Sequence, residues 1–165
     1  MDPASPEALD PAFRLDQFGD YLALEAAGSR NTIEAYGRDV RRLATYAAGQ
    51  GVAGPGDLTP TRLREFVYAL KDVGLSPATI RRQISSARTY FRFLLGEGHI
   101  TRDPSERLES PRGWRRLPTV LTFSEVERML AAPNTDQPLA IRDRALLEFA
   151  YATGVRVSEL VALTL

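Results

Sequence analysis

The sequence has no cysteine, one histidine and one lysine, and each scarcity excludes a class of function. Without cysteine there is no disulfide scaffold, thiolate metal site or cysteine nucleophile. The single histidine, His99, stands in a turn without the further ligands that a metal needs, so no metal and no other cofactor is expected. Apolar runs long enough to span a membrane are missing as well. The acidic, proline-rich start is unlike a signal or transit peptide and predicts a cytoplasmic protein.

The net charge is also zero, but the charges are unevenly spread along the 165 residues. Residues 1–29 carry −5, residues 30–116 carry +7 and residues 117–165 carry −2. All but one of the basic residues are arginines, which bind phosphate and guanine better than lysine does. The basic middle of the chain is compatible with a nucleic-acid partner, although a GC-rich genome would also favour arginine codons.

The spacing of apolar residues predicts helices throughout, and no run alternates in the manner of a strand. Ser29, Thr59 and Ser76 are expected to cap helices, and Thr122 with Glu125 fits a capping box. The predicted helices cover residues 11–27, 31–50, 60–73, 77–96, 124–131, 139–153 and 156–163. The fold class is therefore all-α.

Composition divides the chain into four parts. Residues 1–11 are predicted to be a flexible tail, and residues 12–98 a bundle of four to five helices. Residues 99–117 are rich in proline and arginine and poor in apolar side chains, which is typical of a linker. Residues 118–165 begin a second domain, which is expected to be incomplete because so short a stretch makes a thin core.

Arginines form a stripe on two of the predicted helices. Arg81, Ser85, Arg88 and Arg92 recur at helical spacing on the helix 77–96, and three arginines share an arc of the helix 31–50. A helix of this kind fits the major groove of B-DNA, although a solvated helix surface would give the same pattern. The candidate DNA-binding residues are Thr32, Arg38, Arg41, Arg42, Arg81, Arg82, Ser85, Arg88, Arg92, Arg112, Arg115 and Arg116.

A second candidate site lies near the end of the chain. Arg156 follows Gly154 at the start of a helix, and Glu159, one turn later, can accept a hydrogen bond from its guanidinium. Neighbouring apolar residues are expected to pack around the pair, which would suit one phosphate group. An ion pair that only supports the helix is an equally good interpretation. The apolar neighbours are Val155, Val157, Leu160, Val161 and Leu163.

The segment YATGVRVSELVALTL (151–165) resembles the block of the tyrosine recombinase, or phage integrase, family that carries its first catalytic arginine. Residues 117–127 resemble the entry to the family's catalytic domain, and residues 136–147 the helix before the arginine block. Upstream, Ser29, Thr32, Tyr36 and Asp39 are spaced as in the family's core-binding domain, and the segment LSPATIR (75–81) is similar to it too. The similarity is greatest to the bacterial Xer recombinases, and to the XerD type in particular.

This resemblance implies a SAM-like core-binding domain whose second and fourth helices approach DNA, followed by a basic linker and part of a catalytic domain. It implies that Arg156 binds the scissile phosphate with support from Glu159, and that related recombinase subunits share the DNA site. The family's nucleophilic tyrosine and other catalytic residues correspond to positions after Leu165, so the chain as given is expected not to cleave DNA. DNA integration and chromosome dimer resolution are both functions that the resemblance allows.

Two other interpretations remain open on the residues alone. A stand-alone helical regulator could use the same arginine stripes to bind a DNA site without any reaction. A helical protein-interaction module could use them to contact an acidic partner.

Overall fold

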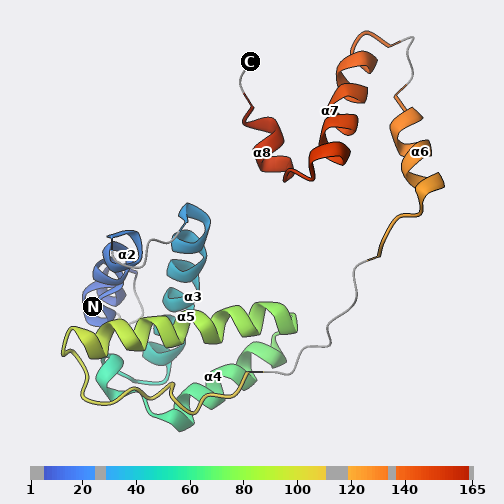
Figure 1. Ribbon diagram of the computed structural model, residues 1–165. Coiled ribbons are helices and arrows are strands. Elements are labelled where there is room, and N and C mark those ends of the chain that lie inside the picture. The colour runs from blue at the N-terminus through green and yellow to red at the C-terminus, as the bar shows by residue number, and fades with distance from the viewer. Residues whose placement is uncertain (1–5, 25–28, 111–118, 134–136, 164–165) are drawn as a thin grey trace. The chain divides into compact units, whose positions relative to one another are not determined.

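The computed structural model describes residues 6–24, 29–110, 119–133 and 137–163, and every regular element in those ranges is a helix (Figure 1). The chain divides into two compact units, residues 1–114 and 115–165. The first unit contains α1 (Pro6–Phe13), α2 (Leu15–Leu24), α3 (Arg30–Gly49), the 3-10 turn η1 (Pro55–Asp57), α4 (Pro60–Asp72) and α5 (Pro77–Gly96). The second contains α6 (Phe123–Ala131), α7 (Ala140–Thr153) and α8 (Val157–Val161). The predicted all-α class is confirmed.

Three helices of the first unit begin at the predicted caps. The side chains of Ser29, Thr59 and Ser76 each accept a hydrogen bond from a backbone N–H three residues later, at the starts of α3, α4 and α5. Pro60 and Pro77 then occupy the first helical position, where a missing N–H costs nothing. These local rules fix where the longest helices start.

The start of the chain differs from the prediction. A single helix over residues 11–27 was expected after a flexible tail, but α1 already begins at Pro6 and the helix breaks at Arg14. Arg14 has a φ of 52°, in the left-handed region, which turns the chain between α1 and α2. The turn lets Leu9 and Phe13 enter the core, where both are buried. The described residues of the expected tail, 6–11, are therefore helical and belong to the bundle.

Aromatic side chains from α2 and α5 form one side of the core. Phe18 meets Tyr90 edge-on at 5.3 Å between ring centroids and lies 5.8 Å from Phe93. The Tyr90 hydroxyl donates a 2.6 Å hydrogen bond to the backbone carbonyl of Phe13, at the end of α1. This bond joins α5 to the break between α1 and α2, and the hydroxyl that makes it lies on a fully buried residue.

The segment after α5 packs on the first unit instead of leaving it. Ile100, Ser105 and Leu108 are buried, and Asp103 accepts hydrogen bonds from the backbone and hydroxyl of Ser105. Arg88 on α5 donates a 2.6 Å hydrogen bond to the Leu108 carbonyl. Residues 99–110 of the expected linker 99–117 are therefore part of the helical unit, because a few apolar residues are enough to anchor an otherwise polar segment.

The second unit is thinly packed. Val126 and Ala140 are its only buried residues in the ranges 119–133 and 137–163. The capping box of Thr122 and Glu125 forms as predicted, and Gly154 ends α7 with a φ of 66°. In the described part of the chain, no helix is long and apolar enough to cross a membrane.

Candidate nucleic-acid interface

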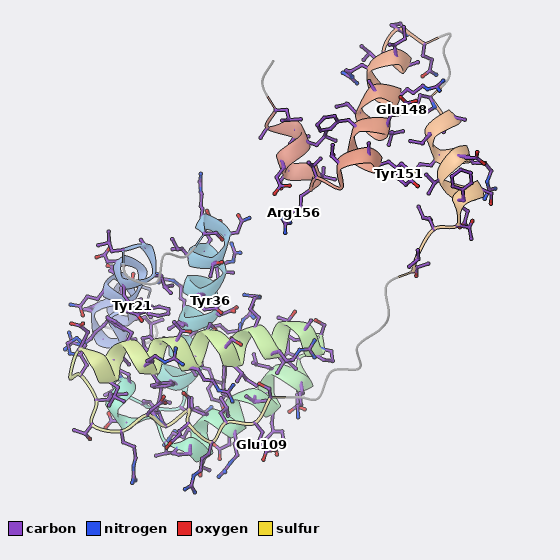
Figure 2. The ribbon with its side chains drawn as sticks, viewed as in Figure 1. Tyr21, Tyr36, Glu109, Glu148, Tyr151 and Arg156 are labelled. Atoms are coloured by element: carbon purple, nitrogen blue, oxygen red, sulfur yellow. The ribbon has the colours of Figure 1, made fainter. Side chains whose placement is uncertain are left out.

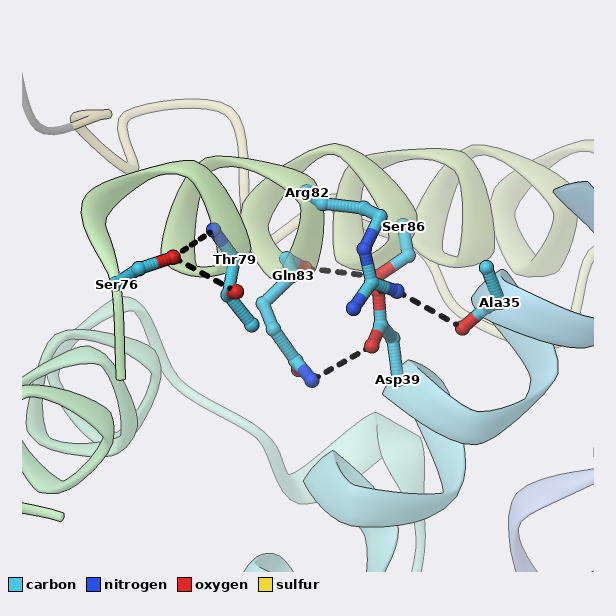
Figure 3. Close-up of polar contacts among 7 residues, drawn as sticks. All are labelled: Ala35, Asp39, Ser76, Thr79, Arg82, Gln83 and Ser86. Carbon is cyan, nitrogen blue, oxygen red and sulfur yellow. Dashed lines mark hydrogen bonds and ion pairs between the residues drawn. The ribbon is translucent and has the colours of Figure 1, made fainter. Parts of the chain in front are cut away.

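The helices α3 and α5 pack against each other through a buried polar contact (Figure 3). Asp39, on α3, is only 2% exposed and directly precedes the first buried apolar residue of that helix, Val40. Its Oδ2 accepts a 2.5 Å hydrogen bond from Nη1 of Arg82, and its Oδ1 accepts a 2.7 Å hydrogen bond from Nε2 of Gln83, both on α5. The same Arg82 nitrogen donates at 3.3 Å to the backbone carbonyl of Ala35. We call these residues, Ala35, Asp39, Arg82 and Gln83, the α3–α5 clamp.

The charge of the clamp is balanced inside the protein. Burial raises the pKa of the Asp39 carboxyl above its usual range, while the positive charge of Arg82 and its hydrogen bond oppose that rise. Gln83, which is buried as well, satisfies the second oxygen. The sequence resemblance points to Asp39 but assigns it no role, and the clamp is a feature that sequence reasoning missed.

The remaining arginine-stripe residues of α5 have different surroundings. Ser85 and Arg92 are exposed, and Arg81 is half-buried. Arg88 instead holds the Leu108 carbonyl, so its guanidinium is already engaged within the unit. Of the predicted stripe, Ser85 and Arg92 are exposed, whereas Nη1 of Arg81 is buried without a hydrogen-bond partner among the described residues.

A similar division holds on α3. Arg38 and Arg42 are exposed, and neither forms an ion pair with any residue that the structure describes. Arg41 forms a 2.8 Å ion pair with Asp10 of α1. Thr32 lies in the first turn, where its hydroxyl is 2.9 Å from that of the capping residue Ser29. Arg38 and Arg42 thus flank the buried Asp39 in the sequence and face outward from the helix that carries it.

We define the arginine faces as Arg38 and Arg42 on α3 together with Arg81, Ser85 and Arg92 on α5. No acidic side chain is among them, and Arg38 and Arg81 adjoin the clamp residues Asp39 and Arg82 in the sequence. Arg112, Trp114, Arg115 and Arg116, which the sequence also nominates, lie outside the described residues. His99 is half-buried, with its ring 6.3 Å from that of Phe93, and no group of metal-ligating residues occurs in the described part of the chain.

Arg156 lies at the turn between α7 and α8, with its side chain directed away from both helices (Figure 2). Its Nη1 donates a 2.9 Å hydrogen bond to Oε1 of Glu159, and its backbone N–H donates a 2.8 Å hydrogen bond to Oε2. These hydrogen bonds lower the pKa of Glu159, backbone contact first. The predicted pair therefore forms, and its charge is retained at neutral pH.

The expected apolar packing around this pair is wrong for most of its members. The side chains of Val157, Val161 and Leu163 are 76%, 77% and 58% exposed. Val155 and Leu160 are half-buried. The three described helices of the second unit are too few to cover both sides of α8, so the guanidinium stands in solvent, 81% exposed.

The comparisons with known proteins cover nearly the whole chain. The family model described as "Phage integrase, N-terminal SAM-like domain" matches residues 15–98, and the model "Phage integrase family" matches residues 119–165. Similar curated proteins include a tyrosine recombinase XerC of Xanthomonas campestris pv. campestris, with 41% identity over 149 residues (90% of this chain, 46% of the relative). Two others are named tyrosine recombinase XerD.

The XerD of Listeria monocytogenes is 36% identical over 150 residues, which are 90% of this chain and half of the relative. That of Chlorobaculum tepidum is 40% identical over 163 residues, which are 96% of this chain and 53% of the relative. The chain thus spans about half the length of the curated relatives it matches. Relatives of both names match at comparable identity, in agreement with the predicted resemblance to Xer recombinases.

Proposed function

We propose, since the chain belongs to the phage integrase family, that its helical unit binds double-stranded DNA for a site-specific recombinase. The observation that carries the proposal is the pair of arginine faces on two helices that pack against each other. Arg38, Arg42 and Arg92 are exposed cations without an ion-pair partner in the described residues. Such side chains bind phosphates and base edges at little cost, because no internal contact has to be broken first.

The dimensions of the two helices support the same proposal. Each of α3 and α5 has 20 residues, about 30 Å at 1.5 Å per residue, which is long enough to cross a DNA duplex groove. Thr32 lies in the first turn of α3, where the helix dipole also favours a phosphate. Arg112, Arg115 and Arg116 would add backbone contacts after the helical unit.

Arg156 is our proposed phosphate ligand in the second unit, and Glu159 is the residue that orients it. The support is the two-point contact between them, which fixes the backbone and the side chain of Arg156 at once. The exposed guanidinium keeps further donors for an anion. In the whole protein we expect this arginine to stabilise the charge that develops on the phosphate during strand exchange.

The biological setting follows from the same proposal. The DNA would be bacterial chromosomal DNA in the cytoplasm, and related recombinase subunits would occupy the same site. Chromosome dimer resolution is the setting that the names XerC and XerD favour, and integration of mobile DNA is the alternative.

A salt titration tests DNA binding directly. The 165-residue chain is mixed with a fluorescent 30-base-pair duplex of mixed sequence, and anisotropy is measured between about 50 and 200 mM NaCl. We expect a steep fall in affinity, and each lost phosphate contact should reduce the slope of log K against log[salt] by about 0.9. Arg38→Ala and Arg92→Ala should each reduce it, while Arg64→Ala, an exposed arginine on α4, should not. No binding at 50 mM NaCl would contradict the proposal.

A further inference from the structure

Arg82 differs from the other arginines of α5 because it is held before any ligand arrives. Its Nη1 donates to both Asp39 and the Ala35 carbonyl of α3. The two hydrogens of Nη1 are thereby used, and three of the five guanidinium donors remain, on Nε and Nη2. Neither of these atoms donates to an acceptor in the residues that the structure describes. The side chain is 40% exposed, so solvent reaches it.

Nε and Nη2 of Arg82 form the edge of the guanidinium that can bind a phosphate at two points. Nε and Nη2 carry parallel N–H bonds on one side of the guanidinium plane, and this pair matches two oxygens of a phosphate. Nη1 points to the other side, toward Asp39. The clamp therefore uses the part of the guanidinium that a two-point phosphate contact does not need.

We infer that Asp39 is a positioning residue for DNA binding, which holds Arg82 so that its Nε–Nη2 edge meets a backbone phosphate where α3 and α5 pack together. This inference rests on the proposed function and adds a specific contact to it. Arg82 stands next to Arg81 in the sequence, and Asp39 next to Arg38, so the phosphate would lie between the two arginine faces. The exposed arginines lose side-chain freedom when they bind DNA, whereas Arg82 has already lost it.

Asp39 could instead act only through its charge, and the two roles predict opposite results. A carboxylate near DNA repels phosphates, so a purely electrostatic role predicts tighter binding when the charge is removed. A positioning role predicts weaker binding for Asp39→Asn, although this substitution removes a negative charge that would repel phosphates. The expected loss is about two- to tenfold in affinity, the range that follows from ordering one long side chain.

Two matched controls separate these effects. Glu34→Gln removes an exposed carboxylate from the same helix and should leave the affinity unchanged or raise it. Arg64→Lys, at an exposed site on α4 outside the arginine faces, should leave the affinity unchanged, while Arg82→Lys keeps the charge and loses the two-point edge. Arg82→Lys should therefore weaken binding as Asp39→Asn does.

The experiment measures the affinity of these four variants, of Arg82→Gln and of the double variant Asp39→Asn/Arg82→Gln, for the 30-base-pair duplex at 100 mM NaCl, each in the 165-residue chain. Circular dichroism checks that each variant is folded. The double variant Asp39→Asn/Arg82→Gln should bind no more weakly than Arg82→Gln alone, because Asp39 acts through Arg82; a purely structural role would weaken binding further.

Each outcome bears on the inference. Binding by Asp39→Asn that equals or exceeds that of the unaltered chain, as for Glu34→Gln, overturns it while DNA binding itself stands. If Asp39→Asn does not fold, the comparison of Arg82→Lys with Arg64→Lys decides, and equal affinities of these two variants overturn the inference. If the unaltered chain does not bind the duplex, the proposed function fails and the inference fails with it.

Discussion

Removing the Tyr90 hydroxyl should destabilise the helical unit by an amount that the structure allows us to work out. The hydroxyl is fully buried and donates a 2.6 Å hydrogen bond to the Phe13 carbonyl. Burial raises the pKa of Tyr90, so the phenol stays protonated and remains a donor. Tyr90→Phe keeps the ring and its edge-on contact with Phe18, and removes only this bond. A buried acceptor left without its donor costs about 1–3 kcal/mol.

The measurement must report on the helical unit alone. Hydrogen–deuterium exchange of the slowest amides of α5 gives the free energy of opening that unit. We expect this free energy to fall by about 1–3 kcal/mol, which corresponds to about 4 °C or more in melting temperature for a unit of this size. The amides of α1 should lose additional protection, because the bond ends at that helix.

Tyr36→Phe is the matched control. Tyr36 is half-buried against the same core, and its hydroxyl forms no hydrogen bond within the described ranges. We expect a change within about 0.5 kcal/mol there. Equal free energies for Tyr90→Phe and the unaltered chain would refute the assignment of a stabilising role to this bond.

Three further predictions follow from the same unit and its neighbour. Leu9→Ala should lower the free energy of unfolding by about 2–5 kcal/mol, measured in urea, since this side chain is 3% exposed; a negligible change would mean that α1 is not part of the core. Arg88→Ala should release the Leu108 carbonyl and speed amide exchange over residues 99–110, with loss of about 1–3 kcal/mol of local stability. Hydrogen bonds from Thr122, backbone first, lower the pKa of Glu125 from its ordinary value, so the capping box stabilises α6 above that ordinary value and the stabilisation is lost as the pH falls through the lowered one. Thr122→Ala should bring the pKa of Glu125 back toward its usual range, as read from a carboxyl NMR titration.

The parts of the fold that follow local rules could be predicted from the sequence. Ser29, Thr59 and Ser76 cap their helices as expected, because a cap needs only its own side chain and a backbone N–H three residues away. The break at Arg14 could not be predicted in this way, since neither glycine nor proline marks it. The hydroxyl of Tyr90, 77 positions after Phe13, holds the chain at this break through a hydrogen bond to the Phe13 carbonyl.

The candidate site shows the same limit. Helical spacing placed Ser85 and Arg92 at exposed positions of α5, because spacing is a property of one helix. It also grouped Arg88 with them, and it had no means to detect the Leu108 carbonyl that Arg88 holds. Asp39 within an apolar helix face was the readable sign of a buried polar partner. That partner, Arg82, lies 43 positions away on another helix, beyond any local pattern.

The bond between Tyr90 and Phe13 also sets an order of events during synthesis of the protein. Its two ends are 77 positions apart, and a ribosome adds about 5–20 residues per second, so Phe13 waits about 4–15 s for its partner to be made. Until then Phe13, Phe18 and Leu22 lack the α5 side of their core and remain open to other apolar surfaces. The helices α1 and α2 are made before α5 but are held in place only after it, so the unit closes when α5 has been made.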